Sequence, residues 1–348
     1  MTVLDDLKIA PIETDWLKKV QTEIDIKTKP PGSLGRIESL ALHMGAIQKT
    51  LKPSADPAHL LLFAGDHGMV AEGVSAWPSE VTTQMVANFL SGGAAANVFA
   101  RAASIAITIA DAGIAGQLPD HPDLVRAGIR SGTRNAMHED ALTPEEVNLA
   151  LHFGASLAQQ RVKDGARTIL LGEMGIGNTA SAALLAHAVD GLDLVALTGP
   201  GAGLDAKGVE RKIVLLQRIA ARRPGRLTPL DALAAFGGLE IAAMAGALVA
   251  AAAGGAIVLV DGFIATSAAL CALRARPEAR EHVVFAHRSK EPGHRLMLQS
   301  LDVEPLIDLD LRLGEGTGAL LCLPLLRAAA AMLGEMATFE SAGISGKE

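Results

Sequence analysis

The 348-residue sequence contains no tyrosine, and aromatic residues make up only 3% of the chain. Proteins that bind single-stranded nucleic acids stack the bases on aromatic side chains, so we do not expect a protein of that kind. Strong basic charge is also absent, because 31 lysine and arginine residues stand against 38 acidic ones, for a net charge of −7. The sequence therefore predicts neither nucleic acid nor an anionic membrane as a partner.

Cysteine is scarce as well. Cys271 and Cys322 lie far apart in apolar stretches, and they have neither redox nor metal-binding spacing. The N-terminus, MTVLDDLKIA, carries acidic residues and lacks the basic start and apolar core of a secretory signal. We expect a cytoplasmic protein without disulfides in a reducing compartment.

One uncharged stretch, residues 241–260, approaches the length of a membrane span. It is rich in alanine, and Gly254 and Gly255 interrupt it. This pattern favours a buried helix, a turn and a short strand that ends at Asp261, rather than a helix that crosses a membrane.

Short apolar runs recur along the chain, and most end in glycine or a polar residue before an alanine-rich helical stretch. They cover residues 60–68, 104–113, 168–178, 194–203, 256–263 and 282–289. Such runs are typical of strands buried on both faces of a parallel sheet. Their alternation with helices predicts a doubly wound, mostly parallel α/β fold. A final run, residues 305–314, alternates apolar and polar residues, which predicts a half-exposed edge strand.

The first part of the chain differs in character, because it is charged and its apolar residues have helical spacing. We expect residues 1–58 to form a small helical domain, joined by residues 325–348. Residues 59–324 then form the α/β domain.

Ligands of open parallel sheets bind beyond the carboxyl ends of the strands. Polar groups follow the predicted strands there, namely Asp66, His67, Asp111, Glu173, Asp261, His287 and Glu315. An aspartate in this place often caps the next helix instead. The histidine spacing matches no metal motif, so no metal site is predicted.

Two glycine-rich loops suit the approach of a ligand to the backbone. In GEMGIGNTASAALL, Gly175 and Gly177 precede Asn178, which can open a helix whose free N–H groups favour an anion. In TGPGAGLDAKGVERK, Gly201 and Gly203 precede Lys212. Neither loop is a P-loop or a dinucleotide motif. A phosphate site and a pair of tight turns explain them equally well.

Residues 73–97 contain hydroxyl groups, Gln84 and Trp77. They suit either the wall of an apolar pocket or a surface loop followed by an amphipathic helix. Near the other end of the chain, LRLGEGTGALL sets Glu315 between two glycines before an apolar stretch. That glutamate is either a helix cap or a base directed at a ligand.

Taken together, these motifs resemble one known family. KPPGSLGRIE, AGDHG, VSAWPSEVTTQM, GEMGIGNTASAALL, TGPGAGLDAKG, FGGLEIAAMAGA, VDGFIATSAAL, FAHRSKEPGH and LDLRLGEGTGAL occur in the family's order across residues 29–326. The family is nicotinate-nucleotide–dimethylbenzimidazole phosphoribosyltransferase. The resemblance implies a homodimer with a Rossmann-like catalytic domain and a smaller helical domain.

The resemblance also implies the reaction. Phosphoribose passes from nicotinate mononucleotide to 5,6-dimethylbenzimidazole, giving nicotinate and α-ribazole 5′-phosphate, a precursor of the lower ligand of cobalamin. Neither cofactor nor metal is expected, because the pyridinium ring is already a good leaving group.

Residue roles follow from the same resemblance. Glu315 is the implied general base, and Glu173 is expected to assist near the ribose or the base. Backbone N–H groups of Gly175, Gly177, Asn178, Gly201 and Gly203 are expected to meet the nucleotide, with Lys212 as the counter-charge. Ser79 and Gln84 are expected to line the benzimidazole pocket. The glycines around Glu315 are expected to leave room for a flat ring, and Asp261 either orients a ligand or caps the next helix.

Two alternatives stay open at this level. One is transfer to another aromatic base, such as adenine or a phenol, because an apolar pocket discriminates a methyl group by only about 1–3 kcal/mol. The other is a non-catalytic nucleotide sensor on the same fold. Carboxylates at both positions 173 and 315 of the predicted rim favour an enzyme.

Overall fold

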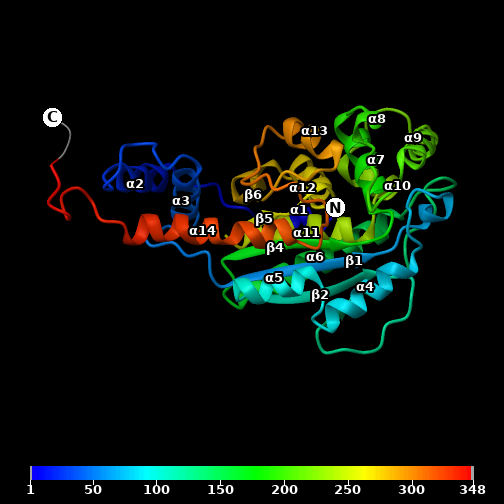
Figure 1. The fold of residues 1–348 in the computed structure, drawn as a ribbon, viewed down its shortest axis with the longest axis horizontal. Helices are drawn as coiled ribbons and strands as arrows, with labels where there is room; N and C mark the ends of the chain where they lie inside the picture. Colours follow the sequence, from blue (N-terminus) through cyan, green and yellow to red (C-terminus); the bar gives the residue numbers. More distant parts are fainter. Residues whose placement is uncertain (1, 346–348) are drawn as a thin grey trace.

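The computed structural model describes residues 2–345, and six parallel strands form its central sheet (Figure 1). The order β3-β2-β1-β4-β5-β6 reverses direction between β1 and β4, as in doubly wound folds. The predicted α/β class is confirmed. The strands are β1 (Ala58–Gly65), β2 (Ala106–Gly113), β3 (Leu124–Arg126), β4 (Thr168–Met174), β5 (Ile257–Val260) and β6 (Val283–Phe285).

Helices cover both faces of the sheet. Neighbouring residues of the central strands point to opposite sides, so each face carries its own set of apolar side chains. Leu61 and Phe63 of β1 belong to one apolar core, while Leu60 and Leu62 belong to the other. The first core is covered mainly by α6 (Pro144–Lys163), α7 (Asn178–Asp190), α10 (Pro229–Phe236), α11 (Leu239–Ala253) and α12 (Phe263–Ala275). The second is covered by α3 (Arg36–Ile47), α4 (Glu80–Leu90), α5 (Ala95–Ala103) and α14 (Thr317–Glu335).

Shorter or peripheral helices complete the described chain. They are α1 (Val3–Asp6), α2 (Thr14–Asp25), α8 (Leu194–Leu197), α9 (Ala206–Ala220) and α13 (Pro292–Ser300), with 3-10 turns η1 (Gly68–Glu72) and η2 (Pro277–His282).

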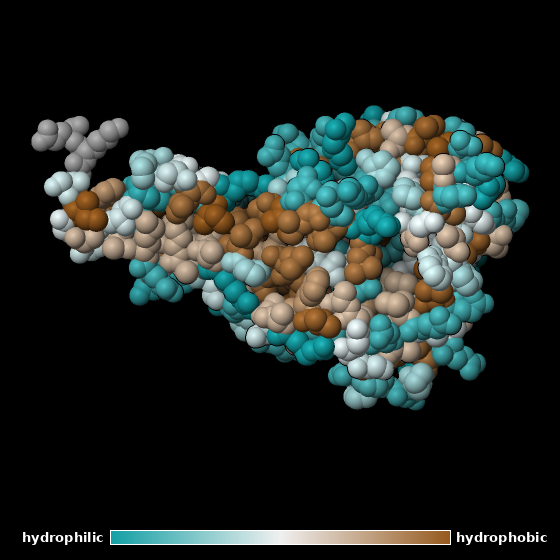
Figure 2. All heavy atoms as spheres, in the orientation of Figure 1, coloured by the Kyte–Doolittle hydropathy of each residue, from teal (hydrophilic) through white to brown (hydrophobic). Residues whose placement is uncertain are grey.

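Helix α14 links the sheet to the N-terminal helices. It packs on β4 and β5 near its start and on α3 further along (Figure 1). Within the described residues it is the one helix with the length and apolarity of a membrane span, with a mean hydropathy of 1.6, and 61% of that stretch is buried in the protein. Figure 2 shows apolar atoms along the outward face of α14, continuing over α5.

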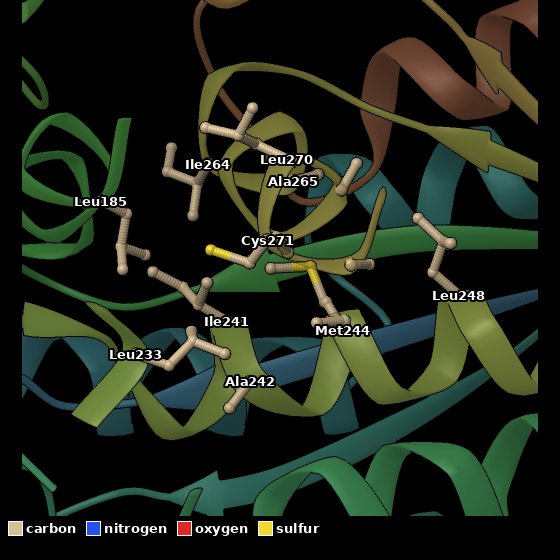
Figure 3. Packing of buried hydrophobic residues seen from close by; sticks show 14 of the residues in the cluster. Leu185, Leu233, Ile241, Ala242, Met244, Leu248, Ile264, Ala265, Leu270 and Cys271 are labelled. Atoms are coloured by element: carbon tan, nitrogen blue, oxygen red, sulfur yellow. The ribbon is translucent and has the colours of Figure 1, made fainter. Parts of the chain in front are cut away.

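The uncharged stretch at 241–260 folds as predicted, into a buried helix, a turn and the strand β5. Small residues let α11 approach α6 closely. A Cβ atom added to Gly154 would lie 1.8 Å from the Ala243 carbonyl oxygen, and one on Gly246 would lie 2.0 Å from that of Leu151. On its other sides α11 packs against α12 and the sheet, and Figure 3 shows Leu185 of α7 and Leu233 of α10 near Ile241, so α11 is enclosed by protein.

The helical part consists of α2 and α3 packed on the far end of α14. Gly45 of α3 lies between Val20 of α2 and Leu333 of α14. Helix α1 instead packs against α6 and α11 of the sheet-bearing part, although the predicted domain 1–58 grouped it with α2 and α3. The two-domain boundary stays a prediction, and residues 346–348 of the segment 325–348 lie outside the described residues.

Two predicted strands are wrong. Residues 194–203 form α8 and a loop, because the Asp193 side chain accepts hydrogen bonds from the N–H groups of Val195 and Ala196 and starts a helical turn. Residues 305–314 run alongside β6 with a single bridge, between His287 and Ile307. Asp310 has a positive φ of 58°, which breaks the extended backbone that a strand requires. Strand β3, which has only three residues, was not predicted, because so short a run has no recognisable pattern.

Candidate active site

A cavity of about 470 Å³ opens at the carboxyl ends of β4, β5 and β6, where an open parallel sheet binds its ligands. It combines an apolar wall with a few polar groups. The apolar lining comes from Trp77, Val81, Met85, Met174, Ile176, Phe263, Ile264 and Leu313. The polar and glycine lining includes Glu173, Gly175, Asn178, Thr179, Gly201, His287, Ser289, Glu291, Arg312, Gly314 and Glu315.

Five of the predicted site residues meet in this cavity, namely Glu173, Gly175, Asn178, Gly201 and Glu315. Lys212 lies behind the wall, where its Nζ donates to Thr179 Oγ1 at 2.9 Å and to the Gly199 carbonyl oxygen at 3.3 Å. Gly177 precedes α7 with a φ of 93°, and a Cβ atom there would lie 2.6 Å from Val70. The glycine is therefore needed for the backbone turn and the packing.

The structure does not bring the other three predicted residues to the cavity wall. Gly203 and Ser79 border separate surface hollows, and Gln84 is exposed on α4. Val81 and Met85, which lie four residues apart on the same helical face, reach the cavity instead. Ser79 and Gln84 do not line this cavity, and their place in a benzimidazole pocket stays a prediction.

Glu315 occupies an unusual backbone position. Gly314, Glu315 and Gly316 all have positive φ, at 87°, 61° and 75°, immediately before α14. For a non-glycine residue this conformation costs roughly 1–2 kcal/mol and persists only where surrounding contacts enforce it. The Glu315 side chain is 4% exposed, and its Oε2 accepts a hydrogen bond from the Ala96 N–H at 3.3 Å.

The glycines of this motif allow close packing at the rim of the sheet. A Cβ atom on Gly314 would lie 2.3 Å from Glu173 Oε1, and one on Gly318 would lie 2.0 Å from His287 Cδ2. Gly316 packs similarly against Leu60 and Gly172. Of these three glycines, Gly314 lines the cavity. The predicted space for a flat ring therefore applies to Gly314.

Asp261 holds the start of α14 from across the fold. It follows β5, is 1% exposed, and accepts hydrogen bonds from the N–H groups of Gly316 at 3.2 Å and Ala319 at 3.0 Å. The capping alternative for Asp261 is therefore correct in kind, although the capped helix is α14 rather than α12, which follows it in the chain. His287 Nε2 lies 3.6 Å from the same carboxylate.

The remaining rim residues lie away from the cavity wall. His67 is buried and pairs with Glu240, with 2.7 Å between Nε2 and Oε1. Asp66 accepts a hydrogen bond from the Ala115 N–H, and Asp111 accepts one from the Ile114 N–H. Within residues 2–345, no group of three histidine, cysteine, aspartate or glutamate side chains is arranged to hold a metal ion.

Comparison with known proteins identifies the family. The sequence model of a family described as phosphoribosyltransferase matches residues 9–344. The chain belongs to this family. It is therefore a phosphoribosyltransferase enzyme rather than a non-catalytic nucleotide sensor.

Individual relatives match the phosphoribosyltransferase along nearly its whole length. The nicotinate-nucleotide–dimethylbenzimidazole phosphoribosyltransferase of Cupriavidus necator is 50% identical over 338 residues, which cover 97% of this chain and 98% of the relative. The protein of the same name from Aromatoleum aromaticum is 50% identical over 93% of this chain and 94% of its own. The crystal structure of CobT from Thermus thermophilus superposes with a TM-score of 0.92 at 46% identity, over 96% of this chain and 100% of that one.

Burial raises the pKa of Glu315 and of Glu173, two of the carboxyls that line the cavity. Burial raises the pKa of Glu315, and the negative charge of Asp261 adds to this, while the Ala96 N–H opposes it. Burial therefore outweighs the lowering expected at a helix start. Burial raises the pKa of Glu173 to about 8, with further increases from Asp261 and Glu240. Carboxyls whose pKa is raised toward neutral pH are suited to acid–base chemistry.

Several cavity residues were missed at the sequence level. Ser289, Glu291 and Arg312 line the wall, but each belongs to a loop whose path depends on tertiary contacts. Thr179, which like Asn178 could be expected to open the helix after the glycine loop, also lines the wall.

The raised pKa of Glu173 predicts a pH-dependent change in stability. The pKa of Glu173 is about 8 in the folded protein and about 4.3 in the unfolded chain. The stability that the protonated Glu173 carboxyl contributes is therefore complete below the unfolded pKa, and it is lost as the pH rises through 8. Glu173→Gln keeps an acceptor for the Asn178 amide but cannot ionise. We expect its melting temperature to exceed that of the wild type increasingly between about pH 5 and pH 9, corresponding to roughly a few kcal/mol at the alkaline end.

Thermal unfolding followed by circular dichroism across this range checks the prediction. Glu335→Gln, at an exposed position on α14, is the control and should follow the wild type at every pH. A Glu173→Gln difference that stays constant with pH would show that Glu173 does not titrate in this range.

Proposed function

We propose that this phosphoribosyltransferase moves phosphoribose from nicotinate mononucleotide to 5,6-dimethylbenzimidazole. The products are nicotinate and α-ribazole 5′-phosphate, for the lower ligand of cobalamin. The relatives at about 50% identity carry the name of this reaction. The observation that carries the proposal is a buried carboxyl, Glu315, in the same cavity as a glycine loop suited to a phosphate.

Glu315 acts as the general base. A benzimidazole nitrogen becomes a strong nucleophile when the other ring nitrogen loses its proton, and a carboxylate within hydrogen-bond reach can accept that proton. Burial raises the pKa of Glu315, which brings its basicity closer to what neutral pH requires. Val81 and Met85 supply the apolar surface against which the flat base packs.

The nucleotide lies toward Thr179 at the start of α7 and the loops that contain Gly201 and Ser289. The start of α7 offers a favourable dipole for an anion, and its Asn178 and Ala180 N–H groups donate to the Gly175 and Gly177 carbonyls. Lys212 supplies positive charge from behind the wall, and burial lowers its pKa to about 8. A phosphate nearby favours the charged form of this lysine.

The transfer itself passes through an oxocarbenium-like state at C1′, as in glycoside cleavage. The benzimidazole nitrogen forms a bond to C1′ as the bond to the nicotinate ring nitrogen breaks. Attack on the face opposite nicotinate converts the β to the α configuration. Glu173 is largely protonated at neutral pH, so it places no second full negative charge beside Glu315 and can donate a hydrogen bond near the ribose.

Glu315→Gln is expected to reduce turnover by at least about 10²-fold, because general-base catalysis typically contributes 10²–10⁴-fold. Binding of nicotinate mononucleotide should change little, since the amide has the same shape. Steady-state rates and equilibrium titration of the nucleotide check both statements. Near-normal turnover would remove Glu315 from the role of base.

The base specificity needs a direct assay. Incubation of the wild type with nicotinate mononucleotide and a panel of dimethylbenzimidazole, benzimidazole, adenine and p-cresol, with products identified by mass, separates the proposed reaction from transfer to another aromatic base. Dimethylbenzimidazole should give the highest kcat/KM. A higher kcat/KM with adenine or the phenol would favour the alternative.

We also propose a cytoplasmic homodimer. The buried, unpaired thiols of Cys271 and Cys322 suit a reducing compartment. The apolar outward face of α14 and α5 supports the dimer (Figure 2). Among the described residues, Leu321 of α14 is 38% exposed and Val98 of α5 is 46% exposed. Continuous apolar surface of this kind favours association with another copy.

Leu321→Asp should shift sedimentation equilibrium from twice the mass of one chain toward the mass of one chain, because a charge on this face opposes its burial. Leu149→Asp, on α6, is the matched control, since Leu149 is also exposed but lies on another face. Equal masses for the two variants would contradict the proposed interface.

A further inference from the structure

One carboxylate lies where the proposed function places a phosphate. Glu291 precedes α13, is 5% exposed, and lines the cavity. Its backbone N–H donates to Ser289 Oγ at 3.3 Å, which fixes the loop on the nucleotide side of the cavity. Glu291 has no part in the reaction as described so far.

The surroundings of the Glu291 carboxyl are those of an anion site. A Cβ atom on Gly199 would lie 2.2 Å from Glu291 Oε2, so the glycine is needed for the side chain to fit. The N–H of Gly201 stabilises the ionised carboxylate. Yet Oε2 is buried without a hydrogen-bond partner among the described residues. A buried oxygen of this kind is costly unless something else binds it.

The charged groups that face Glu291 are Lys212 from α9 and Arg312 from the segment before Glu315. Two hydrogens of the Lys212 ammonium are directed to Thr179 Oγ1 and the Gly199 carbonyl, which leaves a third for a ligand. Neither cation forms a salt bridge with Glu291 within 4.0 Å in the described chain. The carboxylate therefore shares an anion site with Lys212 without being neutralised by a direct ion pair.

A phosphate dianion brought to this site meets a second anion. Two close negative groups cannot both stay fully ionised in a buried site, and a shared proton relieves the repulsion. We propose that Glu291 carries a proton when the nucleotide is bound and donates a hydrogen bond to an oxygen of the 5′-phosphate. Before the nucleotide binds, the same side chain faces Lys212 as a resident anion. This inference rests on the proposed function, because that function supplies the phosphate.

The proton comes from solvent when the phosphate arrives as a dianion. One proton is bound by the carboxylate as the complex forms, and no bond of the nucleotide changes. Burial already raises the pKa of Glu291 in the protein alone, against the opposing effect of Lys212, so the proton is gained readily. Above that pKa, affinity for the nucleotide should fall by about tenfold for each further pH unit, because each unit makes the protonated form tenfold rarer.

Isothermal titration calorimetry of nicotinate mononucleotide tests the proposal at about pH 8, where a phosphate monoester with a second pKa near 6 is a dianion. Titrations in two buffers of different ionisation enthalpy measure the protons bound. The wild type should take up about one proton more per nucleotide than Glu291→Gln, because Lys212, whose pKa is about 8, gains protons beside the phosphate in both proteins. Glu291→Gln should bind without that proton, and at least as tightly, because its amide donates a hydrogen bond at every pH.

Glu304→Gln is the control, because Glu304 is exposed and lies outside the cavity; it should match the wild type. Nucleotide binding by the wild type without proton uptake would overturn the proposal, and so would weaker binding by Glu291→Gln, which is expected if the carboxylate accepts hydrogen bonds from ribose. If the variant does not fold, the absence of proton uptake by the wild type still contradicts the proposal.

Failure of the underlying function would look different. If nicotinate mononucleotide does not bind the wild type at all, the proposed substrate is wrong. The same titration with inorganic phosphate then tests Glu291 by itself. A smaller proton uptake in Glu291→Gln than in the wild type supports the proposal, and equal uptake contradicts it.

Discussion

The hydrogen bonds from the start of α14 to the buried carboxylate of Asp261 hold the active-site rim together. Asp261 directly follows β5, so the sheet sets its position. The helix start whose N–H groups donate to Asp261 is remote in sequence. Glu315 directly precedes that helix start in a left-handed conformation that an unconstrained chain avoids. The sheet, through one aspartate, thereby sets where the proposed base can point.

This arrangement concentrates acidic groups in a buried space. Burial raises the pKa values of Glu173, Asp261 and Glu315, and each ionised neighbour makes the next ionisation harder. Backbone N–H groups donate hydrogen bonds to Asp261 and stabilise its ionised form best among the three carboxyls. The ionised form of Glu173 is stabilised less, by a hydrogen bond from the Asn178 amide. The cluster can thus supply one basic carboxylate at Glu315 beside a neutral acid at Glu173.

The nucleotide side of the cavity also balances charge within a buried space. Lys212 is buried with its ammonium directed to Thr179 and Gly199, and Glu291 faces the same region. This side of the cavity therefore contains groups of both signs, whose protonation can adjust to an incoming dianion. Glycines at 199 and 201 make this close approach sterically possible.

Much of this could be predicted from sequence, because apolar runs and glycine motifs are local. Glu173, Gly175 and Asn178 fall where a strand, a loop and a helix follow one another directly. The strand predicted at 194–203 is wrong because Asp193 starts a helical turn, which the composition of the run does not indicate. Which residues of α4 face the cavity depends on the rotation of the helix against the sheet, so the sequence did not indicate that Val81 and Met85 line it. The roles of Asp261 and Glu291 depend on partners that are remote in sequence, and spacing along the chain carries no information about such contacts.

The most direct measurement is the pH dependence of turnover in Asp261→Asn. If Asp261 both positions Glu315 and raises its pKa, kcat should fall and the acid limb of its pH profile should move to lower pH, because the negative charge that opposes ionisation of Glu315 is gone. Affinity for nicotinate mononucleotide should change little. A profile that superimposes on that of the wild type, in both height and pH, would contradict the central role of Asp261.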